Sequence, residues 1–222
     1  MVFSNNIRIF VIITQTKQII MKKLLLIVII TQILFLSCSN TYKNSSIKEG
    51  DVIFHTSTSG QSKAIQEITK SKYSHVGIIC KIKDQLYVLE AVEPVRIISL
   101  KSWIKKGIGG KYTVMRYDGT ISNKQKQSMV AYGKKQIGLK YDLKFKWDDK
   151  RMYCSELVWK IFDHVGITLC ETTKFSDYFV GGSEASKIVK TRYPSGLPLN
   201  EPVVTPVQLY DSDLLDLVFS NY

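Results

Sequence analysis

Cys154 has the sequence context that most favours nucleophilic chemistry. It opens the segment 154–164, whose apolar residues recur with helical spacing. A sulfur at the start of a helix lies near the positive end of the helix dipole and near free N–H groups, which favour a thiolate and can donate to an oxyanion. Cys80, within an apolar strand pattern, and Cys170 lack this context. The pattern predicts Cys154 as a nucleophile, although a cysteine at a helix start can also be structural.

The base that a nucleophilic cysteine needs is usually a histidine, and the chain has three. His164 lies ten residues beyond Cys154 on the same predicted helix, about 15 Å away along its axis, so it cannot pair with that thiol. His55 follows a short predicted strand, and His75 opens another one. The local pattern leaves both His55 and His75 open as the base.

Glu90 is the candidate for orienting the imidazole, because it is the one carboxylate within an apolar strand pattern, 86–92. A carboxylate on such a face costs free energy unless it is paired. If the hairpin turn is Lys83-Asp84, Glu90 becomes a same-face diagonal neighbour of His75. A turn one residue later separates the two further. Glu93 is the competing carboxylate and is expected at the solvent end of the strand.

These residues must be positioned by strands and helices. The patterns of those elements predict one α+β domain over residues 50–222. Strand patterns cover 52–54, 75–83, 86–92, 95–100 and 112–117. Helical patterns cover 61–69, 124–136 and 154–164, and Thr205-Pro206 is expected to open a last helix that runs toward Leu217. Strands and helices without regular alternation indicate the α+β class.

The N-terminal region predicts an export signal. Met21-Lys22-Lys23 precedes the apolar segment 24–36, which is too short to span a bilayer and ends at Ser37-Cys38. This pattern resembles a bacterial lipoprotein signal, so we expect a signal peptide over 1–37, in which 1–20 is an over-extended start, a lipidated Cys38 and a polar tether over 38–49. The alternative is an uncleaved anchor over 8–36. Both place the domain in the cell envelope, facing outside the cytoplasm from a membrane.

The positive charge of the chain is weak evidence for nucleic-acid binding. The formal net charge is +12, but residues 1–38 hold four cations and no acid, which leaves 27 cations against 19 acids, or +8, for the rest. The remainder has no run of clustered Lys and Arg longer than two. We therefore expect no nucleic-acid partner, and the excess suits an anionic envelope surface. Without Cys38 the chain keeps three cysteines, so at least one thiol is unpaired within it.

Five motifs in one order carry a family resemblance. They are residues 50–54 (GDVIF), 73–78 (YSHVGI), 89–91 (LEA), 138–142 (GLKYD) and 153–158 (YCSELV), joined by Val203-Val204-Thr205-Pro206, Leu209 and Ser212-Asp213 near the C-terminus. Together they resemble the circularly permuted papain-like amidases, the YiiX-type branch of the NlpC-type cysteine hydrolases. The resemblance runs from about Gly50 to about Leu217 and implies a permuted papain-like fold in which an antiparallel sheet packs against a nucleophile-bearing helix.

The resemblance also implies the roles of individual residues. Cys154 matches the nucleophile, His75 the base and Glu90 the residue that orients it, whereas His55 matches no catalytic position. Tyr141 matches a tyrosine that helps to form the oxyanion pocket, with an aromatic core residue as the alternative. A further pair matches positions that line the same cleft: Asp51, which could equally cap a turn, and Tyr73. No metal and no organic cofactor is implied.

Three function classes follow from the resemblance and the predicted location. The first is an amidase or endopeptidase that cleaves cell-wall peptides such as peptidoglycan stems. The second is a lipid-directed acyl hydrolase or acyltransferase, because other permuted members resemble the lecithin:retinol acyltransferases. Membrane anchoring and Trp103 near Lys101, Lys105 and Lys106 suit a lipid surface. The third, a catalytically silent envelope-binding lipoprotein, is disfavoured because the Cys/His/Glu set is intact.

Overall fold

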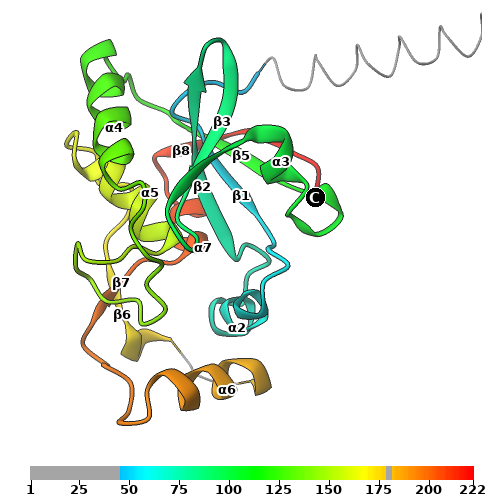
Figure 1. The fold of residues 1–222 in the computed structure, drawn as a ribbon, viewed down its shortest axis with the longest axis vertical. Helices are drawn as coiled ribbons and strands as arrows, with labels where there is room; N and C mark the ends of the chain where they lie inside the picture. The colour runs from blue at the N-terminus through cyan, green and yellow to red at the C-terminus, as the bar shows by residue number, and fades with distance from the viewer. Residues whose placement is uncertain (1–45, 179–181) are drawn as a thin grey trace, which may run out of the picture. The chain divides into compact units, whose positions relative to one another are not determined.

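A six-stranded antiparallel sheet forms the centre of the computed structural model, which describes residues 46–178 and 182–222 (Figure 1). Its strand order is β4-β3-β2-β1-β5-β8. The strands are β1 (Val52–His55), β2 (His75–Ile82), β3 (Gln85–Glu90), β4 (Arg96–Ser99), β5 (Thr113–Tyr117) and β8 (Leu215–Ser220). A separate two-stranded ribbon joins β6 (Thr173–Lys174) to β7 (Pro202–Val203). The antiparallel sheet and the helices around it confirm the predicted α+β class.

Helices cover the sheet and extend beyond its lower end in Figure 1. They are α2 (Gly60–Thr69), α3 (Leu100–Ile104), α4 (Asn123–Lys135), α5 (Cys154–Asp163), α6 (Ser183–Arg192) and α7 (Pro206–Tyr210). Two short 3-10 turns span Ile108–Gly110 and Phe175–Asp177. The patterns at 61–69, 124–136 and 154–164 correspond to α2, α4 and α5, whereas α3 and α6 had no predicted counterpart.

The core lies on both faces of the sheet, because alternate side chains of each strand point to opposite faces. Val52 and Phe54 of β1 pack in the cluster that contains the apolar stripe of α5, whereas Ile53 packs with Trp103 of α3 on the other face. All four residues of β1 are buried. The larger cluster fixes α5 against β2, so the first residues of these two elements are brought together.

The β2–β3 hairpin has the register that brings Glu90 toward His75. Ile82 pairs with Gln85, so the turn is Lys83-Asp84, and both turn residues have positive φ angles of 46° and 63°. Positive φ at both central residues is typical of the two-residue hairpin turn that matches strand twist. Of the two turns that the sequence left open, the structure has Lys83-Asp84, which makes Glu90 the diagonal neighbour of His75.

The C-terminal segment corrects the prediction of a helix that continues toward Leu217. Thr205 does cap a helix that begins with Pro206, and its hydroxyl accepts from the Gln208 N–H at 3.3 Å. The helix ends at Tyr210, and 215–220 instead forms the edge strand β8 beside β5. A period-two pattern of apolar residues in 215–220, with an aromatic residue at 219, favours a strand once β5 offers an unpaired edge.

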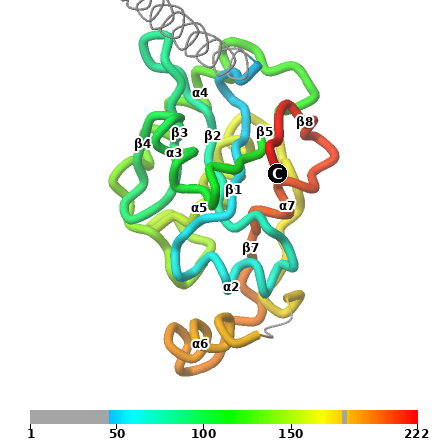
Figure 2. Tube along the Cα trace, turned by 90° about the vertical axis from the view of Figure 1, so that its right-hand side faces the viewer, coloured from blue at the N-terminus to red at the C-terminus, as the bar shows by residue number. Residues whose placement is uncertain are grey.

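Helix α6 is held against α2 by a carboxylate cap. The Glu67 carboxylate accepts from the backbone N–H groups of Glu184 at 3.1 Å and Ala185 at 2.8 Å. These N–H groups lie in the first turn of α6, where they have no partner inside the helix. Figure 2 shows α6 next to α2 at one end of the sheet.

The predicted signal peptide and Cys38 lie outside the described residues. The described chain forms one unit over Ile47–Tyr222. Within the described residues, no helix is both long and apolar enough to cross a membrane.

Candidate active site

The structure brings Cys154, His75 and Glu90 together from three elements. Cys154 is the first residue of α5, His75 the first of β2 and Glu90 the last of β3. The His75 Nε2 atom lies 2.8 Å from Glu90 Oε2, and the same imidazole is hydrogen-bonded to the Cys154 thiol. Since Nε2 faces Glu90, Nδ1 is the nitrogen left for the sulfur. All three residues are buried.

The electrostatics of this chain favour a thiolate–imidazolium pair. Burial alone would lower the pKa of His75, but hydrogen bonds with Cys154 and Glu90 raise it to about 9. Burial alone would raise the pKa of Cys154, yet the bond to His75, the charge of His75 and the Val76 N–H together lower it. Each group therefore stabilises the charged form of the other. The other two described cysteines differ, because burial raises the pKa of both Cys80 and Cys170 to about 11.

Glu90 is held in its ionised form by Arg96, which the sequence did not single out. Arg96 of β4 lies opposite Glu90 in the sheet register, and its Nε and Nη2 atoms donate to Glu90 Oε1 at 3.0 and 2.9 Å. Burial alone would raise the pKa of Glu90, but the bonds from His75 and Arg96 lower it to about 2. Lys106 adds a more distant cation, 3.9 Å from the same oxygen. The paired register of β3 and β4 is the signal that could have revealed Arg96.

Tyr141 lies beside the sulfur, as a donor near a developing oxyanion must. Its hydroxyl donates toward Cys154 Sγ at 3.9 Å and accepts from Gln61 Nε2 at 3.1 Å. Burial and the adjacent Cys154 charge raise the pKa of Tyr141 well above its ordinary value, so the phenol keeps its proton. Gln61 is in turn fixed by Arg192, whose Nη1 donates to Gln61 Oε1 at 2.6 Å. Sequence reasoning missed Gln61 and Arg192.

His55 is the second histidine that the local sequence pattern allowed as the base. In the structure it packs beside the ring of His75. The two residues are paired across β1 and β2, and their ring centroids are 5.2 Å apart. His55 stacks on Trp103 at 3.9 Å, and burial together with the charge of His75 lowers its pKa to about 3, so it is neutral. Trp103 is fully buried in this stack, which overturns the expectation that it suits a lipid surface.

Asp51 and Tyr73 do not line either of the cavities beside the nucleophile. Asp51 caps the turn before β1, where its Oδ2 accepts from the Lys48 N–H at 2.7 Å, and it is paired with Arg116 at 2.7 Å. The Tyr73 hydroxyl lies 2.8 Å from Thr113 Oγ1, within the aromatic core. Asp51 therefore has the contacts of a residue that caps a turn, which was the alternative to a place in the cleft. Tyr73 is a core residue.

Comparison with known proteins places this geometry in a family. Residues 46–219 match the model of the family described as "Permuted papain-like amidase enzyme, YaeF/YiiX, C92 family". The chain belongs to this family. It is therefore a cysteine hydrolase of the peptidase and amidase class, and its α+β fold is the permuted papain-like one.

Two relatives of the permuted papain-like amidases resemble the chain over most of its length. The protein "Uncharacterized protein YiiX" of Escherichia coli strain K12 is 40% identical over 174 residues, which cover 78% of this chain and 86% of the relative. The crystal structure titled "metalloprotein yiiX", from Escherichia coli O157:H7, superimposes with a TM-score of 0.76 at 39% identity. The superposition covers 80% of this chain and 99% of the E. coli chain.

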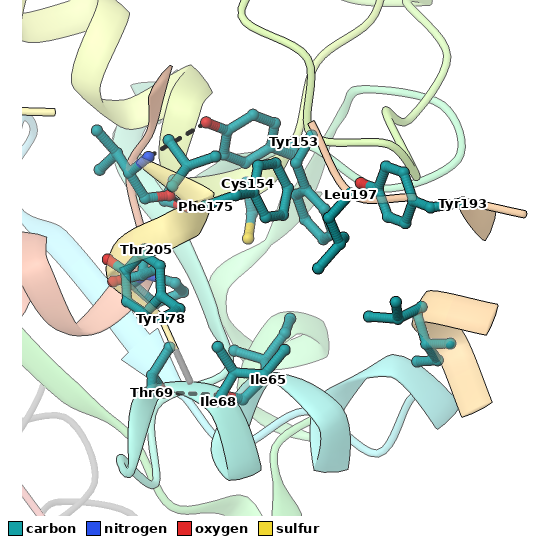
Figure 3. A pocket seen from close by; sticks show the side chains of 17 residues that line it. Ile65, Ile68, Thr69, Tyr153, Cys154, Phe175, Tyr178, Tyr193, Leu197 and Thr205 are labelled. Atoms are coloured by element: carbon teal, nitrogen blue, oxygen red, sulfur yellow. Dashed lines mark hydrogen bonds between the residues drawn. The ribbon is translucent and has the colours of Figure 1, made fainter. Parts of the chain in front are cut away.

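Two cavities lie beside the catalytic residues of this permuted papain-like amidase. A polar cleft contains His75, Glu90 and Tyr141 together with the charged side chains of Lys106 and Arg192. A second, apolar pocket contains Cys154 and opens between α2 and α6. Figure 3 shows the sulfur pointing into the space between the α2 side chains and the aromatic side chains above them. No sequence motif marks this pocket, because its lining comes from segments that are far apart in the chain.

Proposed function

We propose that the protein hydrolyses an amide bond through an acyl-thioester on Cys154. The observation that carries this proposal is the hydrogen-bonded chain Cys154–His75–Glu90, with Tyr141 beside the sulfur. The thiolate attacks the carbonyl carbon, and the negative charge moves to the carbonyl oxygen. N–H groups at the start of α5 and the Tyr141 hydroxyl are placed to stabilise that charge.

Proton transfers follow from the position of His75. When the C–N bond breaks, the imidazolium of His75 gives its proton to the leaving amine, and the acyl group stays on the sulfur. His75 then takes a proton from water, which attacks the thioester and releases a carboxylic acid and the Cys154 thiolate. Glu90 keeps the imidazole in place during both steps, and Arg96 holds Glu90.

Cell-wall peptides are the first substrate class. The polar cleft supports this class, because it carries charges of both signs, from Glu93, Lys106 and Arg192, that suit a peptide with charged termini and side chains. Acylated lipids are the second class. The apolar pocket at Cys154 supports this second class, because it suits a hydrocarbon chain.

The proposed location is the cell envelope, with the domain lipid-anchored through Cys38 and facing outside the cytoplasm. The signal-like segment that ends at Ser37-Cys38 supports this proposal. An excess of basic over acidic residues in the mature chain suits an anionic lipid or wall surface.

A resident metal at this site finds no support in the donor set, although the E. coli structure is titled a metalloprotein. Among the described residues, no group of three or more His, Cys, Asp and Glu side chains is arranged to hold a metal ion. His75 is engaged by Glu90 and Cys154, and Glu90 already accepts from Arg96. The proposed mechanism therefore has no step that uses a metal.

Mass spectrometry of reaction products tests the proposed function. The protein is incubated with muropeptides and, separately, with phospholipids and N-acyl amines, beside its Cys154→Ser variant. We expect a new carboxylic acid and a released amine or headgroup with the wild type and none with the variant. Unchanged substrates, together with tight binding of one of them, would instead support a silent envelope-binding protein.

A further inference from the structure

A chain of hydrogen bonds, called the relay below, runs from the end of α6 to the catalytic sulfur. Arg192, the last residue of α6, donates through Nη1 to Gln61 Oε1 at 2.6 Å. Gln61, near the start of α2, donates through Nε2 to the Tyr141 hydroxyl at 3.1 Å, and that hydroxyl donates toward Cys154 Sγ at 3.9 Å. The three side chains that precede the sulfur all line the polar cleft. The relay therefore joins three segments that are far apart in the sequence.

Arg192 sets the direction of every hydrogen bond in the relay. A guanidinium has only N–H donors, so the atom of Gln61 that faces it must be the amide oxygen. The amide NH₂ group of Gln61 then faces Tyr141, whose oxygen must accept. The Tyr141 proton is consequently left for the side of the sulfur, where the carbonyl oxygen of a substrate becomes negative during attack.

The backbone of Tyr141 is held in place by contacts that do not involve Arg192. Tyr141 forms a bridge with Met152, whose N–H donates to the Lys140 carbonyl at 3.1 Å and whose carbonyl accepts from the Asp142 N–H at 3.2 Å. Met152 lies just before α5 and is fully buried, so this loop is fixed beside the nucleophile. Loss of Arg192 should therefore leave the Tyr141 ring in place and release only the direction of its O–H bond.

The positive charge of Arg192 also acts on the relay. The salt bridges of the described residues do not include Arg192, so no described carboxylate pairs with its guanidinium. A second hydrogen bond from its Nη1 goes to the neutral Leu143 carbonyl at 3.0 Å. Burial has the largest effect on the pKa of Tyr141 and raises it, whereas the charge of Arg192 lowers it. The cation thus favours negative charge near the phenol, which is where the oxyanion forms.

We propose that Arg192 is a positioning residue of the oxyanion site, because it turns the Gln61 amide so that the Tyr141 proton points to the reacting carbonyl oxygen. Without the guanidinium, the Gln61 amide can flip and present its oxygen to Tyr141. The phenol then donates to Gln61, and the oxyanion loses one donor. This inference rests on the proposed acyl-thioester chemistry and adds to it a residue of α6 that acts through Tyr141.

A double-mutant cycle of Arg192→Met and Tyr141→Phe tests this role. The burst of p-nitrophenol from p-nitrophenyl acetate measures the rate at which Cys154 is acylated, a step that passes through the oxyanion. Arg192→Met should slow this burst by about tenfold or more in the wild type and by less than about twofold in Tyr141→Phe. Iodoacetamide alkylation of Cys154, which forms no oxyanion, should change far less than acylation does. Lys190→Met, which removes an exposed cation from the same turn of α6, is the matched control and should keep the wild-type burst.

Gln61→Glu separates the direction of the relay from the attachment of α6 to α2. The new carboxylate can still accept from Arg192, as a salt bridge, but it cannot donate to Tyr141, so the phenol proton turns toward it. We expect acylation of Cys154, relative to its alkylation, to be about 10²-fold slower than in the wild type, with an equal or higher urea unfolding midpoint. If Arg192 only fastened α6 to α2, acylation would stay close to the wild-type rate.

The outcomes separate this inference from the proposed function. An equal loss from Arg192→Met in both backgrounds, or wild-type acylation in Gln61→Glu, would overturn the positioning role of Arg192 alone. Parallel losses of acylation and alkylation in Arg192→Met would have the same consequence, because they would indicate a disturbed nucleophile. Absence of a p-nitrophenol burst from the wild-type protein would overturn both proposals.

Discussion

At the scale of single residues, the site is a line of alternating charges that each stabilise the next. The Cys154 thiolate, the His75 imidazolium, the Glu90 carboxylate and the Arg96 guanidinium follow one another. All but Arg96 are buried, so their interactions are weakly screened by solvent. Loss of one member therefore changes the protonation of its neighbours as well as their position.

Glu90→Gln should shift the pH dependence of Cys154 alkylation. The carboxylate helps to raise the pKa of His75 to about 9, so its loss lowers that pKa and weakens the thiolate–imidazolium pair. The acid limb of the alkylation profile should move to higher pH, and kcat/KM should fall by roughly 10²-fold or more. Glu93→Gln, at the competing exposed carboxylate, should leave the acid limb of the alkylation profile at its wild-type pH. If the acid limb lies at the same pH in both variants, Glu90 does not help to activate Cys154.

Tyr141→Phe should lower kcat more than it changes KM. The hydroxyl beside the sulfur is expected to stabilise charge that develops only during attack, and loss of one such donor costs roughly 10²–10³-fold in kcat. Steady-state kinetics with an N-acyl amino acid checks this split, and alkylation of Cys154 in the variant shows that the thiol is still activated. An unchanged kcat would make Tyr141 a core aromatic residue, the alternative that the sequence left open.

At the scale of elements, the β2–β3 hairpin sets the distance between His75 and Glu90. Gly77 lies in this hairpin, and a Cβ atom there would approach Val88 Cγ1 to 2.5 Å and the Leu89 carbonyl oxygen to 3.0 Å. Gly77→Ala should therefore destabilise the fold by about 1–3 kcal/mol, the range for overpacking. Gly60→Ala is the control, because nothing lies within 4 Å of its Cβ and it begins α2.

Urea unfolding measures both glycine variants. We expect a lower midpoint for Gly77→Ala and an equal or higher one for Gly60→Ala, since alanine restricts the unfolded chain more than glycine does. Equal midpoints would mean that strand β3 can move away from β2 at little cost. The separation of His75 and Glu90 would then depend on their own hydrogen bond and not on the hairpin.

Sequence patterns predicted the elements whose periodicity is uninterrupted and missed those that depend on a neighbour. Two β-rich runs across a short polar break predicted β2 and β3, and helical spacing predicted α5 with its nucleophile. Helix α6 has one fully buried residue, Ala185, so it has no apolar stripe to detect. Strand β8 has an alternating apolar pattern of its own, but it also depends on the edge that β5 offers, and a local pattern does not show that edge. The same limit hid Arg96 and the apolar pocket, since both depend on contacts between distant segments.

At the scale of the whole molecule, the proposed function joins a lipid anchor at Cys38 to a cysteine hydrolase site. Cys38→Ser removes the predicted lipidation site and should move the protein from the membrane fraction to the soluble fraction. Fractionation with immunoblotting measures this change, and Cys170→Ser, at a thiol without an activating neighbour, is the control. A Cys38→Ser protein that stays with the membrane would favour the uncleaved anchor over 8–36.

The central claim, that His75 activates Cys154 as the nucleophile, is tested most directly by residue-resolved iodoacetamide labelling of the folded protein at neutral pH. The pKa of Cys154 is lowered, whereas burial raises the pKa of both Cys80 and Cys170 to about 11. Peptide mass spectrometry over time should therefore show Cys154 modified far faster than either of the others. Labelling of Cys154 at a rate equal to or below theirs would contradict the account.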